Sequence, residues 1–277
     1  MGPGNVLKDL IECGKVATVR LTEIFRQAQE SLIVMNAHRV NSGVMPDLKT
    51  VTSDFFFLRR RTEEAVASTI GDLCRTRLPD RMGIPPEEIQ VLSPTRKGPT
   101  GTASLNLLLQ AQLNPPAPDK KEKKWGDFSF REGDRVMQIR NNYDILWKKT
   151  DGTQVGTGIF NGDIGVITEI DLNAELLTVV FDDRQAEYDF DMLRELELAY
   201  AMTVHKSQGS EYQAVVLAAW SCAPNLRTRR VLYTAITRAR KLLVVVGRED
   251  ILQTMTENQR QSRRYSGLKL RLQEKEQ

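Results

Sequence analysis

Thr203-Val-His-Lys-Ser-Gln-Gly-Ser-Glu-Tyr212, followed by the apolar run Ala214 to Trp220, is the stretch that decides the fold class. A polar, glycine-centred segment that leads into a buried strand is where an α/β domain places ligand-binding groups. A second pair follows the same logic, because the segment Val231 to Arg240 precedes the apolar run Leu242 to Gly247. The two pairs predict a strand, a helix and a strand, with cationic side chains crowded at the end of the helix.

Further segments outward from this stretch alternate between strand and helix patterns. Strands are predicted at Ala17 to Leu21, Asp54 to Leu58 and Ile89 to Leu92, from their apolar and β-branched residues. Helices are predicted from an N-cap at Thr22 to about His38, from an N-cap at Thr62 to about Arg77, and over Thr102 to Leu113. This alternation predicts an α/β fold, an open and mostly parallel sheet covered by helices on both faces.

The composition and the hydrophobic pattern of the sequence change in the middle of the chain. Pro115-Pro-Ala-Pro118 and the lysine-rich Asp119 to Lys124 are expected to form a polar, mobile linker. Short alternating segments separated by turns follow it and predict a small inserted β-barrel; they are Gly133 to Arg140, Gly158 to Gly165, Val166 to Ile170, Leu176 to Phe181 and Gln185 to Tyr188. The predicted domains are residues 1–120 and 196–260 for the α/β unit, 121–195 for the barrel and 261–277 for a charged tail.

Composition excludes several classes of protein. The 277 residues are 40% hydrophobic and 27% charged, which is typical of a soluble globular protein able to bury a core. A formal net charge of +3 is too small to indicate nucleic-acid binding without local clustering. Three scattered cysteines and two histidines argue against a structural metal site and favour a reducing cytoplasm. No apolar run approaches the roughly 18 residues of a membrane span, so no membrane contact is expected.

The main parts of a nucleotide hydrolase are missing from the sequence. A phosphate-binding loop needs the pattern G-x-x-x-x-G-K-[ST], and Gly14-Lys15 lacks both the upstream glycine and the following hydroxyl. No strand ends in an Asp-Glu pair suited to hold Mg²⁺. The chain by itself is therefore not expected to hydrolyse ATP, although its arginines could stabilise phosphates held by another domain.

The two polar stretches resemble motifs V and VI of superfamily 1 helicases, most specifically the RecD family of exodeoxyribonuclease V alpha chains and their stand-alone relatives. Leu21 to Ala28 resembles motif IV, Val91 to Gly98 resembles the nucleic-acid-contacting loop after it, and the barrel resembles the SH3-like domain 2B. The resemblance covers nearly the whole chain. It implies a RecA-like motor domain, 2A, without its own P-loop and with 2B inserted.

The family also has a first motor domain, 1A, which carries the Walker motifs and which this sequence lacks. The expected explanation is an expressed piece of a larger helicase, with a truncated reading frame as the minor alternative. The resemblance implies that the intact enzyme uses ATP and Mg²⁺, held mainly by 1A, and moves 5′ to 3′ on DNA. Activity of this chain alone is left open.

The resemblance assigns roles residue by residue. Arg26 and Arg238 match arginines that approach the γ-phosphate, while Gln27, Gly209 and Glu211 match nucleotide-binding positions. Ordinary surface cations are the alternative interpretation of the two arginines. Thr203 and His205 match motif V positions that face single-stranded DNA, and Lys206, Ser207 and Gln208 are expected to be donors beside them. Thr95, Arg96 and Lys97 are expected to form a cationic turn that also contacts the DNA backbone. Hydroxyl, amide and cationic donors suit phosphate oxygens.

Implied partners are single-stranded DNA, domain 1A and, for a member of a nuclease complex, the exodeoxyribonuclease V beta and gamma subunits. Two other functions stay open. The missing P-loop is also compatible with a non-enzymatic module that binds single strands or acts as an adaptor. The motifs also fit the helicase part of a conjugative relaxase.

Overall fold

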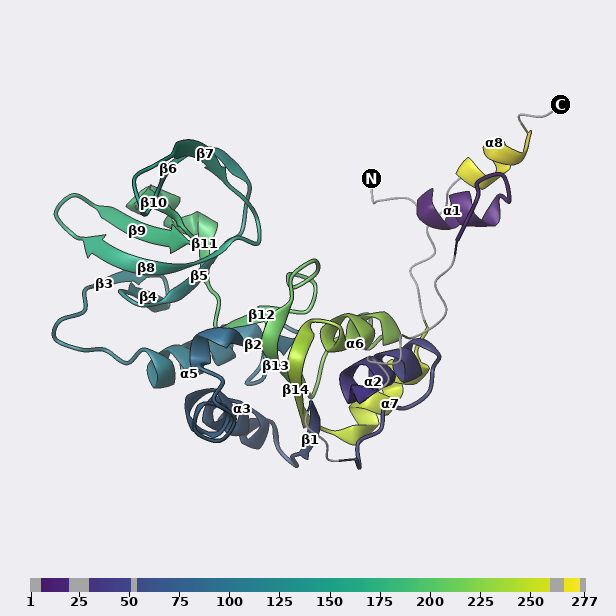
Figure 1. The fold of residues 1–277 in the computed structure, drawn as a ribbon. Helices are drawn as coiled ribbons and strands as arrows, with labels where there is room; N and C mark the ends of the chain where they lie inside the picture. Colours follow the sequence, from purple (N-terminus) through teal and green to yellow (C-terminus); the bar gives the residue numbers. More distant parts are fainter. Residues whose placement is uncertain (1–5, 20–29, 51–53, 260–266, 275–277) are drawn as a thin grey trace.

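A computed structural model describes residues 6–19, 30–50, 54–259 and 267–274 of the chain. Its main body has two parts, a parallel sheet flanked by helices and an antiparallel barrel next to one end of that sheet (Figure 1). The short helices α1 (Val6–Glu12) and α8 (Leu268–Glu274) lie together, where Lys269 Nζ is 3.2 Å from Glu12 Oε2.

The parallel sheet has five strands in the order β1-β14-β13-β2-β12. These are β1 (Phe55–Arg59), β2 (Ile89–Ser93), β12 (Ala201–Thr203), β13 (Tyr212–Ala219) and β14 (Ala239–Gly247). The two apolar runs form the central pair β13 and β14, because only strands buried on both faces can be apolar at every position. The strand predicted at Ala17 to Leu21 is wrong for residues 17–19, which are not in a strand, and its remainder lies outside the described residues. Ala201 to Thr203 supplies an edge strand that was not predicted.

Helices cover both faces of this sheet (Figure 1). The faces alternate along β13, since Ala214, Val216 and Ala218 pack in one apolar cluster and Val215 and Leu217 in the other. The first cluster is covered by α3 (Glu63–Asp72), the π-helical turn Leu73–Arg77, α4 (Leu78–Met82) and α5 (Thr102–Leu113). The second is covered by α2 (Leu32–Asn41), α6 (Arg229–Ile236) and α7 (Glu249–Glu257).

Two helix boundaries differ from the prediction. Helix α2 begins at Leu32, where Ser31 accepts a hydrogen bond from the Val34 amide (3.3 Å) as its N-cap, and the predicted cap Thr22 is not among the described residues. Residues 20–29 lie outside the described part. The Thr62 cap is confirmed by its bond from the Ala65 amide, but the helical run continues past Arg77 to Met82. Pro79 lies within this run, two residues after the π-helical turn Leu73–Arg77 ends.

The barrel is a seven-stranded antiparallel sheet in the order β11-β5-β8-β9-β10-β6-β7. Its strands are β5 (Arg135–Gln138), β6 (Asn142–Lys149), β7 (Val155–Ile159), β8 (Ile164–Asp171), β9 (Leu176–Phe181), β10 (Arg184–Asp189) and β11 (Leu196–Leu198). A 3₁₀ segment, η4 (Phe190–Glu195), leads into β11. The expected fold class, a mostly parallel α/β domain with an inserted antiparallel barrel, is confirmed.

The linker prediction is wrong for part of its length. Glu122–Trp125 forms strand β3, which pairs antiparallel with β4 (Phe128–Arg131). Glu122 also accepts a hydrogen bond from the buried Arg131 guanidinium (2.7 Å), so the lysine-rich run is folded against the barrel from this point. A pair of strands stabilises the backbone that composition alone identified as mobile.

A buried polar network joins the barrel to the parallel domain. The Asp134 carboxylate, fully buried, accepts hydrogen bonds from Gln110 Nε2 (2.5 Å), Asn114 Nδ2 (2.8 Å), the Arg131 amide (2.7 Å) and the Tyr200 hydroxyl (2.9 Å). These donors come from α5 and its C-cap residue, from the last residue of β4, and from the link between β11 and β12. Because each buried donor needs an acceptor, the network fixes how the two parts meet.

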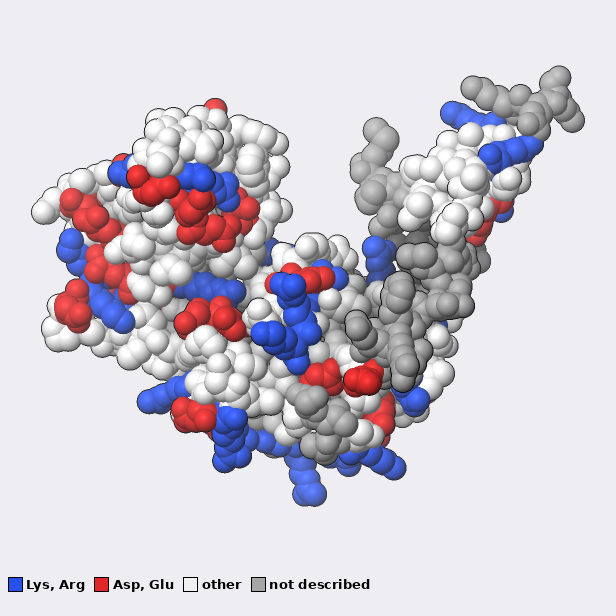
Figure 2. Space-filling view, in the orientation of Figure 1, with Lys and Arg blue, Asp and Glu red and all other residues white. Residues whose placement is uncertain are grey.

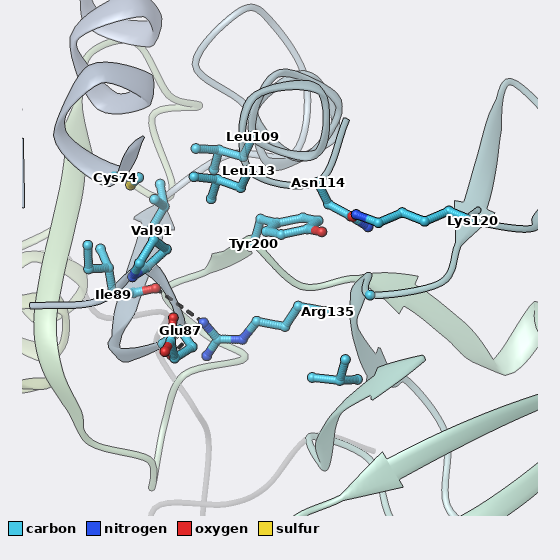
Figure 3. A pocket seen from close by; sticks show the side chains of 13 residues that line it. Cys74, Glu87, Ile89, Val91, Leu109, Leu113, Asn114, Lys120, Arg135 and Tyr200 are labelled. Atoms are coloured by element: carbon cyan, nitrogen blue, oxygen red, sulfur yellow. Dashed lines mark hydrogen bonds between the residues drawn. The ribbon is translucent and has the colours of Figure 1, made fainter. Parts of the chain in front are cut away.

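A cavity of about 320 Å³ lies beside this junction (Figure 3). The Arg135 guanidinium points across it and donates to the backbone carbonyls of Glu87 (3.3 Å) and Ile89 (3.2 Å). Tyr200 and Asn114 form another part of the wall. The first strand of the barrel is thereby tied to the start of β2, at the amino end of the parallel strands.

Candidate nucleic-acid and nucleotide interface

The two loops that are predicted to contact single-stranded DNA lie side by side at the carboxyl edge of the parallel sheet. Strands β2 and β12 are neighbours in register, with Ser93 opposite Thr203. The Val204 amide donates to the Ser93 carbonyl (3.1 Å), so pairing with β2 continues one residue past the end of β12. Residues 95–97 and 203–208 therefore emerge at the edge where open α/β sheets bind ligands.

The loop after β2 is held against the start of helix α5. The carbonyls of Thr95 and Arg96 accept from the amides of Thr102 (3.0 Å) and Ala103 (3.2 Å). These amides are in the first turn of the helix, which lacks intrahelical partners for its N–H groups. The backbone at Thr95 and Arg96 is thus fixed, while the side chains of Arg96 and Lys97 remain exposed.

The loop after β12 is a compact turn. The amides of Lys206 (2.9 Å) and Ser207 (3.2 Å) both donate to the Thr203 carbonyl. Gly209 has a φ of +90°, a conformation that L side chains rarely adopt, and a glycine meets this need without strain. This turn leaves His205 and Gln208 exposed to solvent and Thr203 half-buried.

Ser207 differs from the expectation. Its side chain is fully buried, and its hydroxyl donates to the Val204 carbonyl (2.8 Å). The hydroxyl therefore closes the turn from within and is not presented to a bound strand. Residue type alone did not distinguish an inward serine from an outward one.

Sequence reasoning missed one acidic side chain that connects both loops. Glu197 of β11 lies 2.9 Å from Arg96 Nη2 through Oε1 and 2.8 Å from Lys206 Nζ through Oε2. Glu197 stands in Leu196-Glu-Leu198, a short alternation at the end of the barrel, and nothing in that pattern indicated a charged partner. Only the return of the chain from the barrel brings it to the two cations.

The predicted nucleotide-facing residues meet next to the second loop. Arg238 is half-buried and donates from Nη1 to the Ser210 carbonyl (2.8 Å) and from Nε to the Thr234 carbonyl (3.2 Å). The Tyr212 amide donates to the Arg238 carbonyl (2.9 Å), which places Glu211 beside the same turn. Exposed Glu211 is 3.6 Å from Arg240. Arg26 and Gln27 lie outside the described residues.

Surface charge around the loops is mixed. Figure 2 shows lysine and arginine side chains interspersed with acidic ones over the face it presents. Across the described ranges, no group of three or more His, Cys, Asp or Glu side chains is arranged to hold a metal ion. Within the same ranges, no helix has the length and apolar character needed to cross a membrane.

Two known protein families match the chain. The family described as the ATP-dependent RecD-like DNA helicase SH3 domain matches residues 105–181, which run from α5 into β9. The family described as the UvrD-like helicase C-terminal domain matches residues 198–246. The second range contains the loop after β12, helix α6 and most of β14, so it includes the candidate nucleotide-facing residues other than Arg26 and Gln27.

Curated relatives are similar over much of the chain. An ATP-dependent RecD2 DNA helicase of Deinococcus radiodurans is 32% identical over 246 residues, which are 89% of this chain and 31% of that protein. A RecBCD enzyme subunit RecD of Mycolicibacterium smegmatis is 31% identical over 186 residues, 67% of this chain and 29% of that protein. This chain thus matches about three tenths of the length of these relatives.

The solved structure of a Pif1 helicase from Candida albicans also aligns with the chain. The alignment has a TM-score of 0.48 and 18% sequence identity, and it covers 85% of this chain and 57% of that one.

Proposed function

We propose that this chain, which is similar to the C-terminal part of RecD-like superfamily 1 DNA helicases, forms half of an ATP cleft and part of a single-strand track. The observation that carries the proposal is the pairing of two polar loops, 95–97 and 203–208, at the carboxyl edge of neighbouring parallel strands. In this proposal the intact enzyme moves 5′ to 3′ on DNA. Residues 1–120 and 196–260 act as the motor domain and 121–195 as its insert.

Arg238 is the proposed charge-stabilising residue on the nucleotide side. Its guanidinium is anchored by the carbonyls of Ser210 and Thr234 and by the Thr237 hydroxyl, to which Nη2 donates (3.2 Å), and one N–H on each terminal nitrogen is left for a phosphate. A preorganised cation of this kind neutralises charge that develops on the transferred phosphoryl group. Glu211 and Gly209, from the adjoining turn, are proposed to contact the nucleotide, as are Arg26 and Gln27. A P-loop domain would hold most of the ATP and Mg²⁺.

On the DNA side, the loops offer a cationic and amide surface without a base-reading pattern. Arg96, Lys97 and Lys206 provide charge, and His205, Gln208 and Thr203 provide further hydrogen-bonding groups. Contacts to phosphate oxygens impose no sequence preference, which a translocating motor requires. Proposed partners are single-stranded DNA, a P-loop domain and, by analogy with relatives named RecBCD subunits, the beta and gamma subunits of such a complex. A cytoplasmic location accompanies this function.

The nucleotide half is tested by DNA-stimulated ATP hydrolysis. The 277-residue chain is compared with a chain extended upstream of Met1 to include a P-loop domain. We expect hydrolysis only from the extended chain, and Arg238→Ala to lower its rate by about 10³-fold or more, the effect of removing an arginine finger. Arg230→Ala is the matched control, because Arg230 is exposed in the first turn of α6, the helix that ends just before Arg238. Equal rates for the two variants would remove Arg238 from the proposal.

The DNA half is tested by the anisotropy of a labelled oligo-dT with the 277-residue chain. Replacing Arg96, Lys97 and His205 together by Ala should weaken binding about 25-fold at 0.1 M salt, if two phosphate contacts are lost and each contributes a slope of about 0.7. The control replaces three exposed arginines, Arg75, Arg77 and Arg81, which lie in the π-helical turn Leu73–Arg77 and in α4, outside both loops. An equal loss in the control would mean that bulk charge, and not this track, binds DNA.

A further inference from the structure

Glu197 sits at the centre of the proposed strand track, although it carries the wrong charge to bind DNA. Its carboxylate has one oxygen on Arg96 and the other on Lys206, at 2.9 and 2.8 Å. The two cations come from different loops, and Glu197 comes from the barrel. The acidic group thus fills the gap between the two proposed phosphate-binding side chains.

We infer that Arg96 and Lys206 form one phosphate site, and that the Glu197 carboxylate occupies it until a phosphodiester of the strand displaces it. This inference rests on the proposed function for its physiological ligand. A carboxylate and a phosphodiester both present two acceptor oxygens to a guanidinium fork, so one can take the place of the other. The lysine ammonium binds either group as a point charge.

Exposure makes the exchange possible. The Arg96 side chain is 67% exposed, while those of Glu197 and Lys206 are 33% and 27% exposed. Ion pairs at such partly solvated positions contribute little net free energy, because water screens them, so a polyanion with many contacts can break them. The backbones of both loops are fixed by the Ser93, Thr102 and Thr203 contacts, which keeps the two cations close after Glu197 leaves.

The Glu197 carboxylate therefore competes with DNA phosphates for Arg96 and Lys206, and it is always close to them because it belongs to the same chain. It lowers the affinity of the track for single strands and reduces the number of counterions that binding releases. Removal of its charge should free one phosphate contact. Each phosphate contact contributes about 0.7 to the slope of log K against log salt concentration for a single strand. The gain in affinity is therefore about fivefold at 0.1 M salt and vanishes toward 1 M.

The test uses Glu197→Gln in the 277-residue chain, with oligo-dT anisotropy measured across a salt series. Glu195→Gln is the matched control, because Glu195 lies two residues away and its carboxylate accepts from two neutral amides, Gln138 Nε2 and Asn142 Nδ2, each at 3.0 Å. We expect Glu197→Gln to bind about fivefold tighter at 0.1 M, with a salt slope steeper by about 0.7. Glu195→Gln should follow the wild type.

A second readout separates this inference from the proposed function. Thermal denaturation is followed in phosphate and in chloride at equal ionic strength, and phosphate should raise the Tm of Glu197→Gln more than that of the wild type. If no form binds oligo-dT but phosphate still stabilises Glu197→Gln selectively, the DNA function falls and the phosphate site stands. If Glu197→Gln gains neither strand affinity nor phosphate stabilisation, or binds more weakly than wild type, the inference is overturned.

Discussion

Replacing Asp134 by Asn should break the junction between the parallel domain and the barrel. All four groups around the carboxylate, from Gln110, Asn114, Arg131 and Tyr200, donate hydrogen bonds to it, two to each oxygen. An asparagine has one oxygen, so its NH₂ group must face two donors in either orientation. A buried donor without an acceptor costs about 1–3 kcal/mol, and two cost about 2–6 kcal/mol. The neutral side chain avoids part of the desolvation of a buried charge, so we expect a net loss of about 2–4 kcal/mol.

Urea denaturation followed by tryptophan fluorescence measures this loss. Trp125 reports on the β3–β4 pair, Trp147 on the barrel and Trp220 on the end of β13. With an m value of about 3 kcal/mol/M, a loss of 3 kcal/mol lowers the midpoint by about 1 M. Asp127→Asn, at the exposed turn between β3 and β4, is the control and should leave the midpoint unchanged. An unchanged midpoint for Asp134→Asn would refute the account of this network.

The difference in stability between the wild-type protein and Asp134→Asn should depend on pH. Burial raises the pKa of the Asp134 carboxyl, although the hydrogen bonds that it accepts oppose the rise. A carboxyl whose folded-state pKa is raised makes the folded state less stable as the pH rises from about 3.9, the unfolded value, through the folded-state pKa. Asparagine does not titrate. The stability difference between wild type and Asp134→Asn should therefore be larger at about pH 4.5 than at pH 8.

Three further predictions concern local features. Gly247→Ala should destabilise the protein by about 3 kcal/mol or more in urea, because the new Cβ would lie 1.9 Å from the Ala219 carbonyl oxygen at a φ of +154°. Thr62→Ala should cost about 1 kcal/mol in the same assay, since it removes the bond from the Ala65 amide (3.1 Å) that caps α3. Cys74 should react with Ellman's reagent only after unfolding, because it is 2% exposed and burial raises its thiol pKa to about 12.

Each of these predictions has a clear contrary result. Wild-type stability in Gly247→Ala would mean that the contact between β13 and β14 relaxes freely at their carboxyl ends. No loss in Thr62→Ala would mean that water satisfies the first turn of α3 equally well. Rapid labelling of Cys74 in the folded protein would mean that the wall of the junction cavity opens to solvent.

Local sequence determined the helices and strands wherever a segment had one clear hydrophobic pattern. The apolar runs Ala214 to Trp220 and Leu242 to Gly247 became the central strands, because a long apolar run is stable in a strand only when both its faces are buried. Helix α5 matches its predicted bounds, Thr102 to Leu113. Prediction failed at residues 17–19 and at Glu122–Trp125, where the outcome depended on whether a partner strand was present. A single segment carries no information about its partner.

The sequence by itself determined the fold class and the family resemblance, because periodicity and ordered motifs are local properties of the chain. Tertiary structure alone decided which side chains meet across elements. It turned the Ser207 hydroxyl inward, brought Arg238 against Ser210, and placed Glu197 between Arg96 and Lys206, 101 and 9 residues away along the chain. Such contacts follow from strand order and from the return path out of the barrel, and these are set by the packing of the whole molecule and not by any one segment.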